Sequence, residues 1–151
     1  MTKFEAQDPN FEGRVRASFD RQPAMRTLGA RLGRVAPGEV KVELLYRADL
    51  IQQQDIVHVG IVTAIVDNAC SYAALSLSAP DTAVLAVEYK VNFVAPAKGD
   101  WLLARGEVVR PGGSITVCKG NVTAFDGSEE LVVATMLATM MMLPNRPDLA
   151  D

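Results

Sequence analysis

The chain has 151 residues, of which 49% are hydrophobic, and a formal net charge of −3. This length is typical of one domain, residues 1–151, that buries its own core without a disulfide or metal, and the apolar content excludes an intrinsically disordered protein. The small negative charge argues against nucleic acid as a partner. The arginines between residues 14 and 34 are spread among apolar residues, so we interpret them as solvated charges.

The two cysteines, Cys70 and Cys118, form no CxxC pair, and His58 is the only histidine. This spacing indicates neither a disulfide framework nor a metal site. Residues 1–20 mix charged and apolar side chains, as a signal peptide does not. The longest apolar run, residues 131–143, is too short to cross a bilayer. We therefore expect a cytoplasmic protein with no membrane partner.

In the N-terminal part, residues 9–22 are expected to form a helix because apolar residues recur at four-residue spacing, and Pro23 should end it. Residues 25–35 are expected to form a weak strand interrupted by glycine, followed by a turn at residues 37–38. Alternating apolar and polar side chains over residues 40–47 predict a second strand.

The central part contains the longest predicted element. Residues 49–58 have no clear period and are expected to form a loop. Residues 59–79 combine alanines with large apolar side chains and contain no proline, which predicts a helix that is buried on nearly all sides. Pro80 should close this helix.

The C-terminal part is predicted to be a meander of antiparallel strands, because four apolar stretches are separated by short turns rich in Gly, Pro and Asp. The four stretches are residues 83–94, 100–110, 114–125 and 130–143, and a polar tail begins at residue 144. A helix that is apolar on most sides must be covered by the sheet, so the expected fold class is α+β.

One charged residue, Asp67, lies inside the apolar helix. On a helix it shares one face with Thr63 and Ser71, and this polar stripe should face a substrate cleft or an adjoining subunit. A desolvated carboxylate can act as a nucleophile or as a general base towards water. The equally weighted alternative is a structural carboxylate that is satisfied at a subunit seam.

The start of the same helix is formed by His58, Val59 and Gly60. Backbone N–H groups at a helix start have no intrahelical acceptor, and the helix dipole makes this end positive. Such a site can stabilise an oxyanion that develops on a carbonyl group. Alternatively, His58 only caps the helix and Gly60 only permits close packing.

These features occur in segments that resemble the PaaI-like hotdog-fold acyl-CoA thioesterases of the phenylacetate-pathway type. The helix segment QQQDIVHVGIVTAIVDNACSYAA at residues 52–74 is the most specific part. The segment VEYKVNFVAPAKGD at residues 87–100 and the stretches at residues 21–44 and 110–122 support it. The resemblance covers residues 11–143.

The resemblance implies a hotdog fold, in which a curled antiparallel sheet surrounds one long central helix. It also implies a homodimer, often doubled into a homotetramer, with sites at the dimer seam. Asp67 corresponds to the catalytic carboxylate of the family, and His58 to the histidine of its His-Gly-Gly signature. The backbone N–H of Val59, and with it that of Gly60, is expected in the oxyanion hole. Gln52 occupies the position of a polar amide that orients the thioester or the water.

Two positions depart from the family pattern. Val59 replaces the first glycine of the signature, which keeps the backbone donor but narrows the approach to it. Ala86 lies where some relatives carry a Ser or Thr that assists the nucleophile or water. Thr63 and Ser71 are candidates to replace that hydroxyl, so all three residues are expected to line the substrate site.

The implied activity is that of a hydrolase, an acyl-CoA thioesterase that releases a free acid and CoA. It needs no cofactor, because coenzyme A is part of the substrate. A non-catalytic acyl-CoA sensor is the alternative, and Val59 and Ala86 favour it. A hotdog hydratase would place a histidine on the helix beside the aspartate, whereas His58 precedes the helix. A purely structural oligomerisation module is the remaining alternative.

Overall fold

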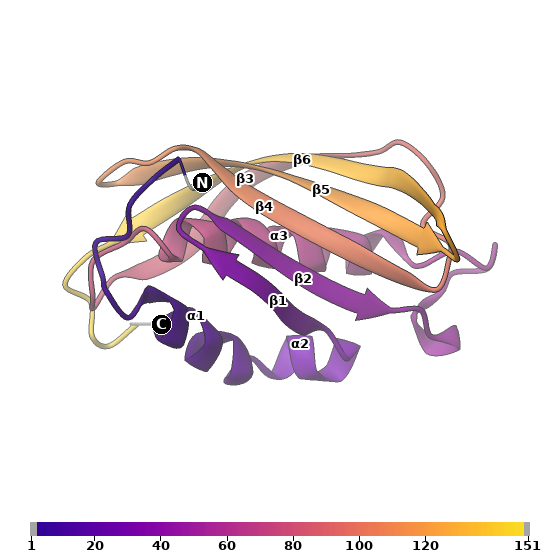
Figure 1. Ribbon diagram of the computed structural model, residues 1–151, viewed down its shortest axis with the longest axis horizontal. Coiled ribbons are helices and arrows are strands. Elements are labelled where there is room, and N and C mark those ends of the chain that lie inside the picture. Colours follow the sequence, from indigo (N-terminus) through magenta and orange to yellow (C-terminus); the bar gives the residue numbers. More distant parts are fainter. Residues whose placement is uncertain (1–2, 150–151) are drawn as a thin grey trace.

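The chain forms a six-stranded antiparallel sheet that curls around one long helix (Figure 1). The computed structural model describes residues 3–149. Its helices are α1 (Phe11–Asp20), α2 (Pro23–Leu28), the 3-10 turn η1 (Ala48–Leu50) and the long helix α3 (Val59–Leu75). Its strands are β1 (Arg31–Ala36), β2 (Glu39–Leu45), β3 (Ala83–Phe93), β4 (Trp101–Arg110), β5 (Ile115–Asp126) and β6 (Glu129–Leu143).

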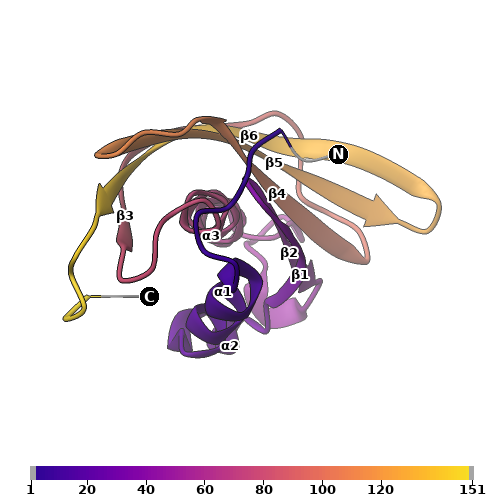
Figure 2. The same cartoon turned by 60° about the vertical axis from the view of Figure 1, so that its left-hand side comes forward.

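The order of strands in the sheet is β1-β2-β4-β5-β6-β3, and every neighbouring pair is antiparallel. Strands β4, β5 and β6 form a meander joined by short turns. The connection through α3 carries the chain from β2 across the sheet to its other end, so β1 and β3 are the two edge strands. The end-on view in Figure 2 shows α3 inside the curled sheet, with α1 and α2 on the side away from β5 and β6. This is the hotdog arrangement, and the expected α+β fold class is confirmed.

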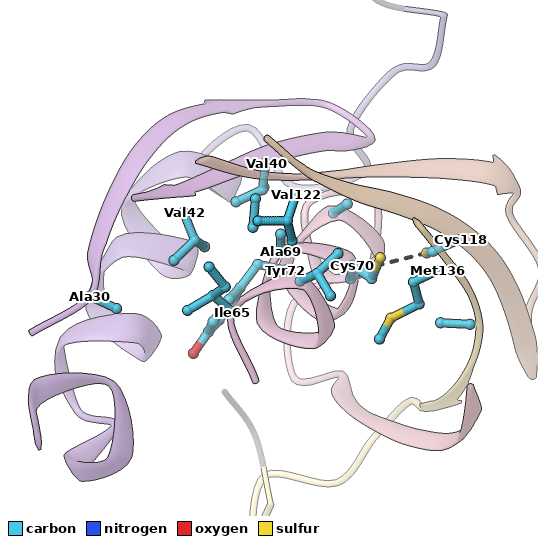
Figure 3. Close-up of a cluster of buried hydrophobic side chains, with 14 of the residues drawn as sticks. Ala30, Val40, Val42, Ile65, Ala69, Cys70, Tyr72, Cys118, Val122 and Met136 are labelled. Carbon is cyan, nitrogen blue, oxygen red and sulfur yellow. Dashed lines mark hydrogen bonds between the residues drawn. The ribbon is translucent and has the colours of Figure 1, made fainter. Parts of the chain in front are cut away.

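The long helix lies directly on the sheet because both surfaces carry small residues. A Cβ atom on Gly106 of β4 would overlap the backbone of Ala69, and one on Gly120 of β5 would press on Val66 and Cys70. These helix residues are fully buried and belong to the central cluster shown in Figure 3. The alanine-rich composition of α3 therefore reflects close contact between its backbone and that of the sheet.

The C-terminal end of α3 is held by a single arginine from α1. The Arg14 guanidinium donates hydrogen bonds to the backbone carbonyl oxygens of Ala79 (2.9 Å), Ser78 (2.8 Å) and Leu75 (3.2 Å). It also pairs with the Asp8 carboxylate at 3.1 Å, and both side chains are nearly buried. Leu75 is the last residue of α3 and the other two carbonyls follow it, so Arg14 fixes α1 against the negative end of this helix.

Most of the predicted elements are confirmed. The helix predicted at residues 9–22 corresponds to α1, and the strand predicted at residues 40–47 corresponds to β2. The four predicted C-terminal strands match β3 to β6 to within one residue at each end. No helix within residues 3–149 is long and apolar enough to cross a membrane.

The strand predicted at residues 25–35 is wrong over its first part, where the chain forms α2, and β1 begins only at Arg31. Pro23 occupies the first turn of α2, where its missing N–H costs no hydrogen bond. Gly29 then ends α2 in the left-handed conformation at φ 72°. The proline therefore begins one helix as it ends another.

The central helix is shorter than predicted and ends at Leu75 instead of residue 79. The Ser76 hydroxyl donates to the Ala73 carbonyl oxygen at 2.7 Å, and the Ser78 hydroxyl donates to that of Leu75 at 2.8 Å. Serine hydroxyls that bind backbone carbonyls offer the chain an alternative to continued helix.

Candidate active site

The predicted site residues fall into two groups along α3. Gln52, His58, Val59 and Gly60 gather at the helix start, whereas Asp67 lies in the middle of the helix. At 1.5 Å of rise per residue, Val59 and Asp67 are about 12 Å apart along the helix axis. Within one protomer, the two groups therefore cannot contact the same carbonyl group.

At the helix start, His58 is the N-cap residue of α3. Its Nδ1 accepts a hydrogen bond from the Gly60 N–H at 2.9 Å, so in the neutral imidazole the proton resides on Nε2. A Cβ on Gly60 would lie 3.1 Å from this Nδ1, which favours glycine there. Because the Gly60 donor is occupied, the N–H of Val59 is the donor left without an acceptor at this end, among residues 3–149. Val59 is 37% exposed, so this donor lies near the surface.

Gln52 lies beside the same helix start. Its side-chain Nε2 donates to Oε1 of Gln54 at 2.8 Å, and its backbone N–H donates to the Ile56 carbonyl oxygen at 2.9 Å. Gln52 and His58 line one open depression on the surface. The predicted grouping of a polar amide with this histidine is thus present in the structure.

Asp67 lines a separate cavity of about 200 Å³ between α3 and the first residues of β3. Within the described part of the chain, its Oδ1 atom is buried and has no hydrogen-bond partner, and the same holds for Oδ1 of the adjacent Asn68. Burial raises the pKa of the Asp67 carboxyl above its ordinary value. Among residues 3–149, no lysine, arginine or histidine lines the cavity. One oxygen of the half-buried carboxylate is therefore desolvated and unpaired, which makes the group a stronger base towards water or a ligand.

Ser71 and Ala86 lie in this cavity with Asp67. The Ser71 hydroxyl contacts the sulfur of Met140 at 3.5 Å, and Met140 pairs with Ala86 across β6 and β3, so the two residues stand at one level. Ser71 thus supplies a hydroxyl opposite the position where Ala86 has none.

Thr63 does not join this group. Its hydroxyl donates to the Val59 carbonyl oxygen within the first turn of α3 at 2.8 Å, and Thr63 is not among the residues that line the Asp67 cavity. The predicted polar stripe is therefore divided, because a threonine on a helix can bind the carbonyl four residues earlier.

The sequence interpretation missed two polar residues of the cavity, Asn68 and Gln22. Asn68 follows Asp67 on α3, and helical spacing alone places it next to the carboxylate. Gln22 lies between α1 and α2, and its Nε2 donates to the Tyr72 hydroxyl at 3.0 Å. No local sequence pattern predicts that contact, since it depends on how α1 packs against α3.

One wall of the cavity belongs to β3, an edge strand of the sheet. Its large apolar side chains are between 44% and 50% exposed at four positions: Leu85, Val87, Tyr89 and Phe93. An edge strand with free backbone groups and exposed apolar side chains is a surface on which a second chain can pair.

Comparison with known proteins identifies the family. Residues 54–131, more than half of the chain, match the family model described as the thioesterase superfamily. The structure is similar to that of a thioesterase family protein from Silicibacter pomeroyi, with 47% sequence identity, a TM-score of 0.87, and coverage of 89% of this chain and 98% of that one.

Two more distant structures agree in fold. The E. coli PaaI protein from the phenylacetic acid degradation operon is 19% identical, with a TM-score of 0.80 over 89% of this chain and 94% of that one. The Haemophilus influenzae thioesterase HI1161 is 14% identical, with a TM-score of 0.76 over 95% of this chain and 94% of that one. With the match over residues 54–131, these findings establish that the chain belongs to the thioesterase superfamily and has the hotdog fold of its PaaI-like members.

Proposed function

We propose that this protein hydrolyses an acyl-CoA thioester to a free acid and CoA, with Asp67 as the catalytic carboxylate. The observation that carries this proposal is the buried, unpartnered oxygen of Asp67 in a cavity without a cation. Leaving a carboxylate unpaired destabilises the fold, so its retention points to a chemical role. Membership in the thioesterase superfamily supports the reaction class.

The complete site is proposed to form between two copies of the chain. The free Val59 N–H and the Asp67 carboxylate lie about 12 Å apart in one protomer, so each protomer holds half of the required groups. The exposed apolar edge of β3 offers the surface on which two copies would pair antiparallel, as a homodimer that can double into a homotetramer. In that arrangement, Asp67 of one copy faces the Val59 amide of the other.

The proposed reaction uses these groups in sequence. The thioester carbonyl oxygen accepts a hydrogen bond from the Val59 N–H at the positive end of α3, which stabilises the charge of the tetrahedral intermediate. Asp67 removes a proton from a water molecule, whose oxygen bonds to the carbonyl carbon. The C–S bond then breaks, and the departing CoA thiolate receives the proton from Asp67. Coenzyme A enters as part of the substrate, and no further cofactor takes part.

A second candidate is an acyl-CoA-binding protein without turnover. It is favoured by the isopropyl group of Val59, which stands beside the only free amide described at the helix start, and by the absence of a hydroxyl on Ala86. Ser71 and the unpaired Asp67 favour hydrolysis, because a binding protein has no need of a desolvated base.

The test is an assay of thiol release on a panel of short, medium and aryl acyl-CoAs. We expect turnover by the wild type and a loss of roughly 10²–10⁴-fold in kcat/KM for Asp67→Asn. Asp20→Asn, an exposed aspartate at the end of α1, is the matched control and should retain full activity. Undiminished turnover by Asp67→Asn would overturn the role of Asp67. Tight binding of acyl-CoA by the wild type with no thiol release would replace hydrolysis with the second candidate.

A further inference from the structure

The cavity beside Asp67 runs lengthwise along one face of α3. Its helix residues recur at helical spacing over about 12 Å: Asp67, Asn68, Ser71, Tyr72 and Leu75. The opposite wall is the start of β3, which follows the end of α3 and runs back along it. Figure 2 shows this part of β3 on one side of α3 and α1 on another. The cavity therefore extends along the axis of α3, and we call it the channel.

The two ends of the channel differ in polarity. Asp67, Asn68 and Ser71 provide the polar end, where the carbonyl and the water react in the proposed function. Leu75, Val84 and Leu85 provide the apolar end, nearer the C-terminus of α3. An acyl chain whose carbonyl is beside Asp67 places its apolar tail towards Leu75, because that direction removes the tail from water.

Gln22 closes the side of the channel near Tyr72. The Gln22 Nε2 donates to the Tyr72 hydroxyl at 3.0 Å, and that hydroxyl also lies 3.2 Å from Oγ of Ser18. The Tyr72 ring packs on Phe19 with centroids 5.9 Å apart. Pro23 restricts the backbone of Gln22 to its extended conformation, φ −90° and ψ 103°. The hydrogen bond to Tyr72 and the restriction by Pro23 thus hold Gln22 in place.

From this geometry we propose that Gln22, fixed by Tyr72, is the residue that limits the size of the acyl group. A cavity of about 150 Å³ in an apolar core holds one benzene ring, so a cavity of about 200 Å³ holds little more than one ring or a short chain of equal volume. A longer acyl group finds no room unless the Gln22 side wall moves. This inference rests on the proposed thioesterase function and names the substrate class of that same site.

The first test compares variants on straight-chain acyl-CoAs from acetyl to palmitoyl. In the wild type, kcat/KM should rise by about fourfold per added methylene until the channel is full and then fall. Gln22→Ala shortens the wall and should move the optimum to longer chains, with a gain of roughly tenfold on the first chains that the wild type rejects. Gln22→Met keeps the volume of the side chain and should keep the wild-type optimum.

The control is Gln7→Ala, the same truncation at an exposed position outside the channel, which should leave the whole profile unchanged. If Gln22→Ala and wild type share one chain-length optimum while both hydrolyse acyl-CoA, the role of Gln22 is refuted and the proposed function stands. If Gln22→Met shifts the optimum as far as Gln22→Ala does, size is not the property that Gln22 controls.

A second readout separates this inference from turnover. Calorimetry with non-hydrolysable S-alkyl-CoA thioethers of increasing length measures the chain length at which binding stops improving. We expect that length to increase in Gln22→Ala. If no acyl-CoA is hydrolysed but this shift in binding occurs, the proposed function fails and the assignment of Gln22 holds. An unchanged length dependence in both assays rejects the assignment.

Discussion

The two faces of α3 differ in what they contact. The face on β4 and β5, the packed face, is fully buried: the helix backbone lies against Gly106, and the side chains of Val66 and Cys70 lie against Gly120. The face towards β3, the open face, carries Asp67 and Asn68, each with a buried oxygen that has no partner among the described residues. The same helix therefore maximises packing on one face and leaves polar groups unsatisfied on the other. Tight packing and unpaired polar groups lie on different faces, and each can be perturbed separately.

The largest expected effect concerns the two thiols buried at the packed face, Cys70 on α3 and Cys118 on β5. Burial raises the pKa of Cys118 to about 12, and burial also raises the pKa of Cys70 well above its ordinary value. At pH 8, Cys118 in the folded protein should react with a thiol reagent on the order of a thousandfold more slowly than after denaturation, and Cys70 should be slowed in the same direction. Rapid labelling of either thiol in the native protein would show that this face opens readily.

A second change overfills the packed face. Gly106→Val places a side chain against the backbone of Ala69 and should destabilise the fold by about 3 kcal/mol, which lowers Tm by roughly 10 °C. Gly113→Val is the matched control, because nothing lies within 4 Å of a Cβ at that position, and it should change stability by less than about 0.5 kcal/mol. Equal Tm values for the two variants would contradict the close contact between helix and sheet.

On the open face, Asp67 should cause a smaller effect, which is a change of Tm with pH. Burial raises the folded-state pKa of Asp67 above its ordinary value of 3.8. The folded state therefore holds the proton more tightly, so the contribution of Asp67 to stability is full below the ordinary pKa and is lost as pH rises through the raised one. The Tm of the wild type should fall relative to that of Asp67→Asn over this window. A difference in Tm that does not vary with pH would mean that the carboxylate is paired in solution.

The smallest expected effect is that of the Ser71 hydroxyl, which makes a weak contact with the Met140 sulfur at 3.5 Å. Ser71→Ala should change the free energy of unfolding by less than about 0.5 kcal/mol. If the hydroxyl orients water or substrate, kcat/KM should fall by about fivefold, as expected for one neutral hydrogen bond. A fall in Tm without a fall in kcat/KM would assign Ser71 to the packed face.

The sequence predicted the parts of this molecule that depend on local patterns. Short turns between alternating stretches defined β3 to β6, and an alanine-rich segment without proline defined α3. The helix α2 was missed because Pro23 is equally compatible with the end of one helix and the start of the next. Only Gly29, whose left-handed conformation caps α2, shows that Pro23 also begins a helix.

The candidate site was predictable to the extent that it lies on one helix. Asp67 stood out as a charge among apolar residues, and His58 stood out as the residue before the helix. The division of these residues into two groups follows from the length of α3, and the loss of Thr63 from the cavity follows from its bond to Val59. Gln22 could not be predicted, because its place in the channel depends on packing between segments that are far apart in the sequence.

Arg14 attaches the N-terminal segment, which contains α1 and α2, to the central helix. Its hydrogen bonds to the end of α3 fix α1, and α1 in turn carries the chain to Gln22 at the wall of the channel. The segment is also built into the core through Val15, Phe19 and Met25, so its position relative to α3 is fixed. Under the role proposed for Gln22, a change in this packing would alter the acyl groups that fit, while the sheet and the carboxylate stay as they are.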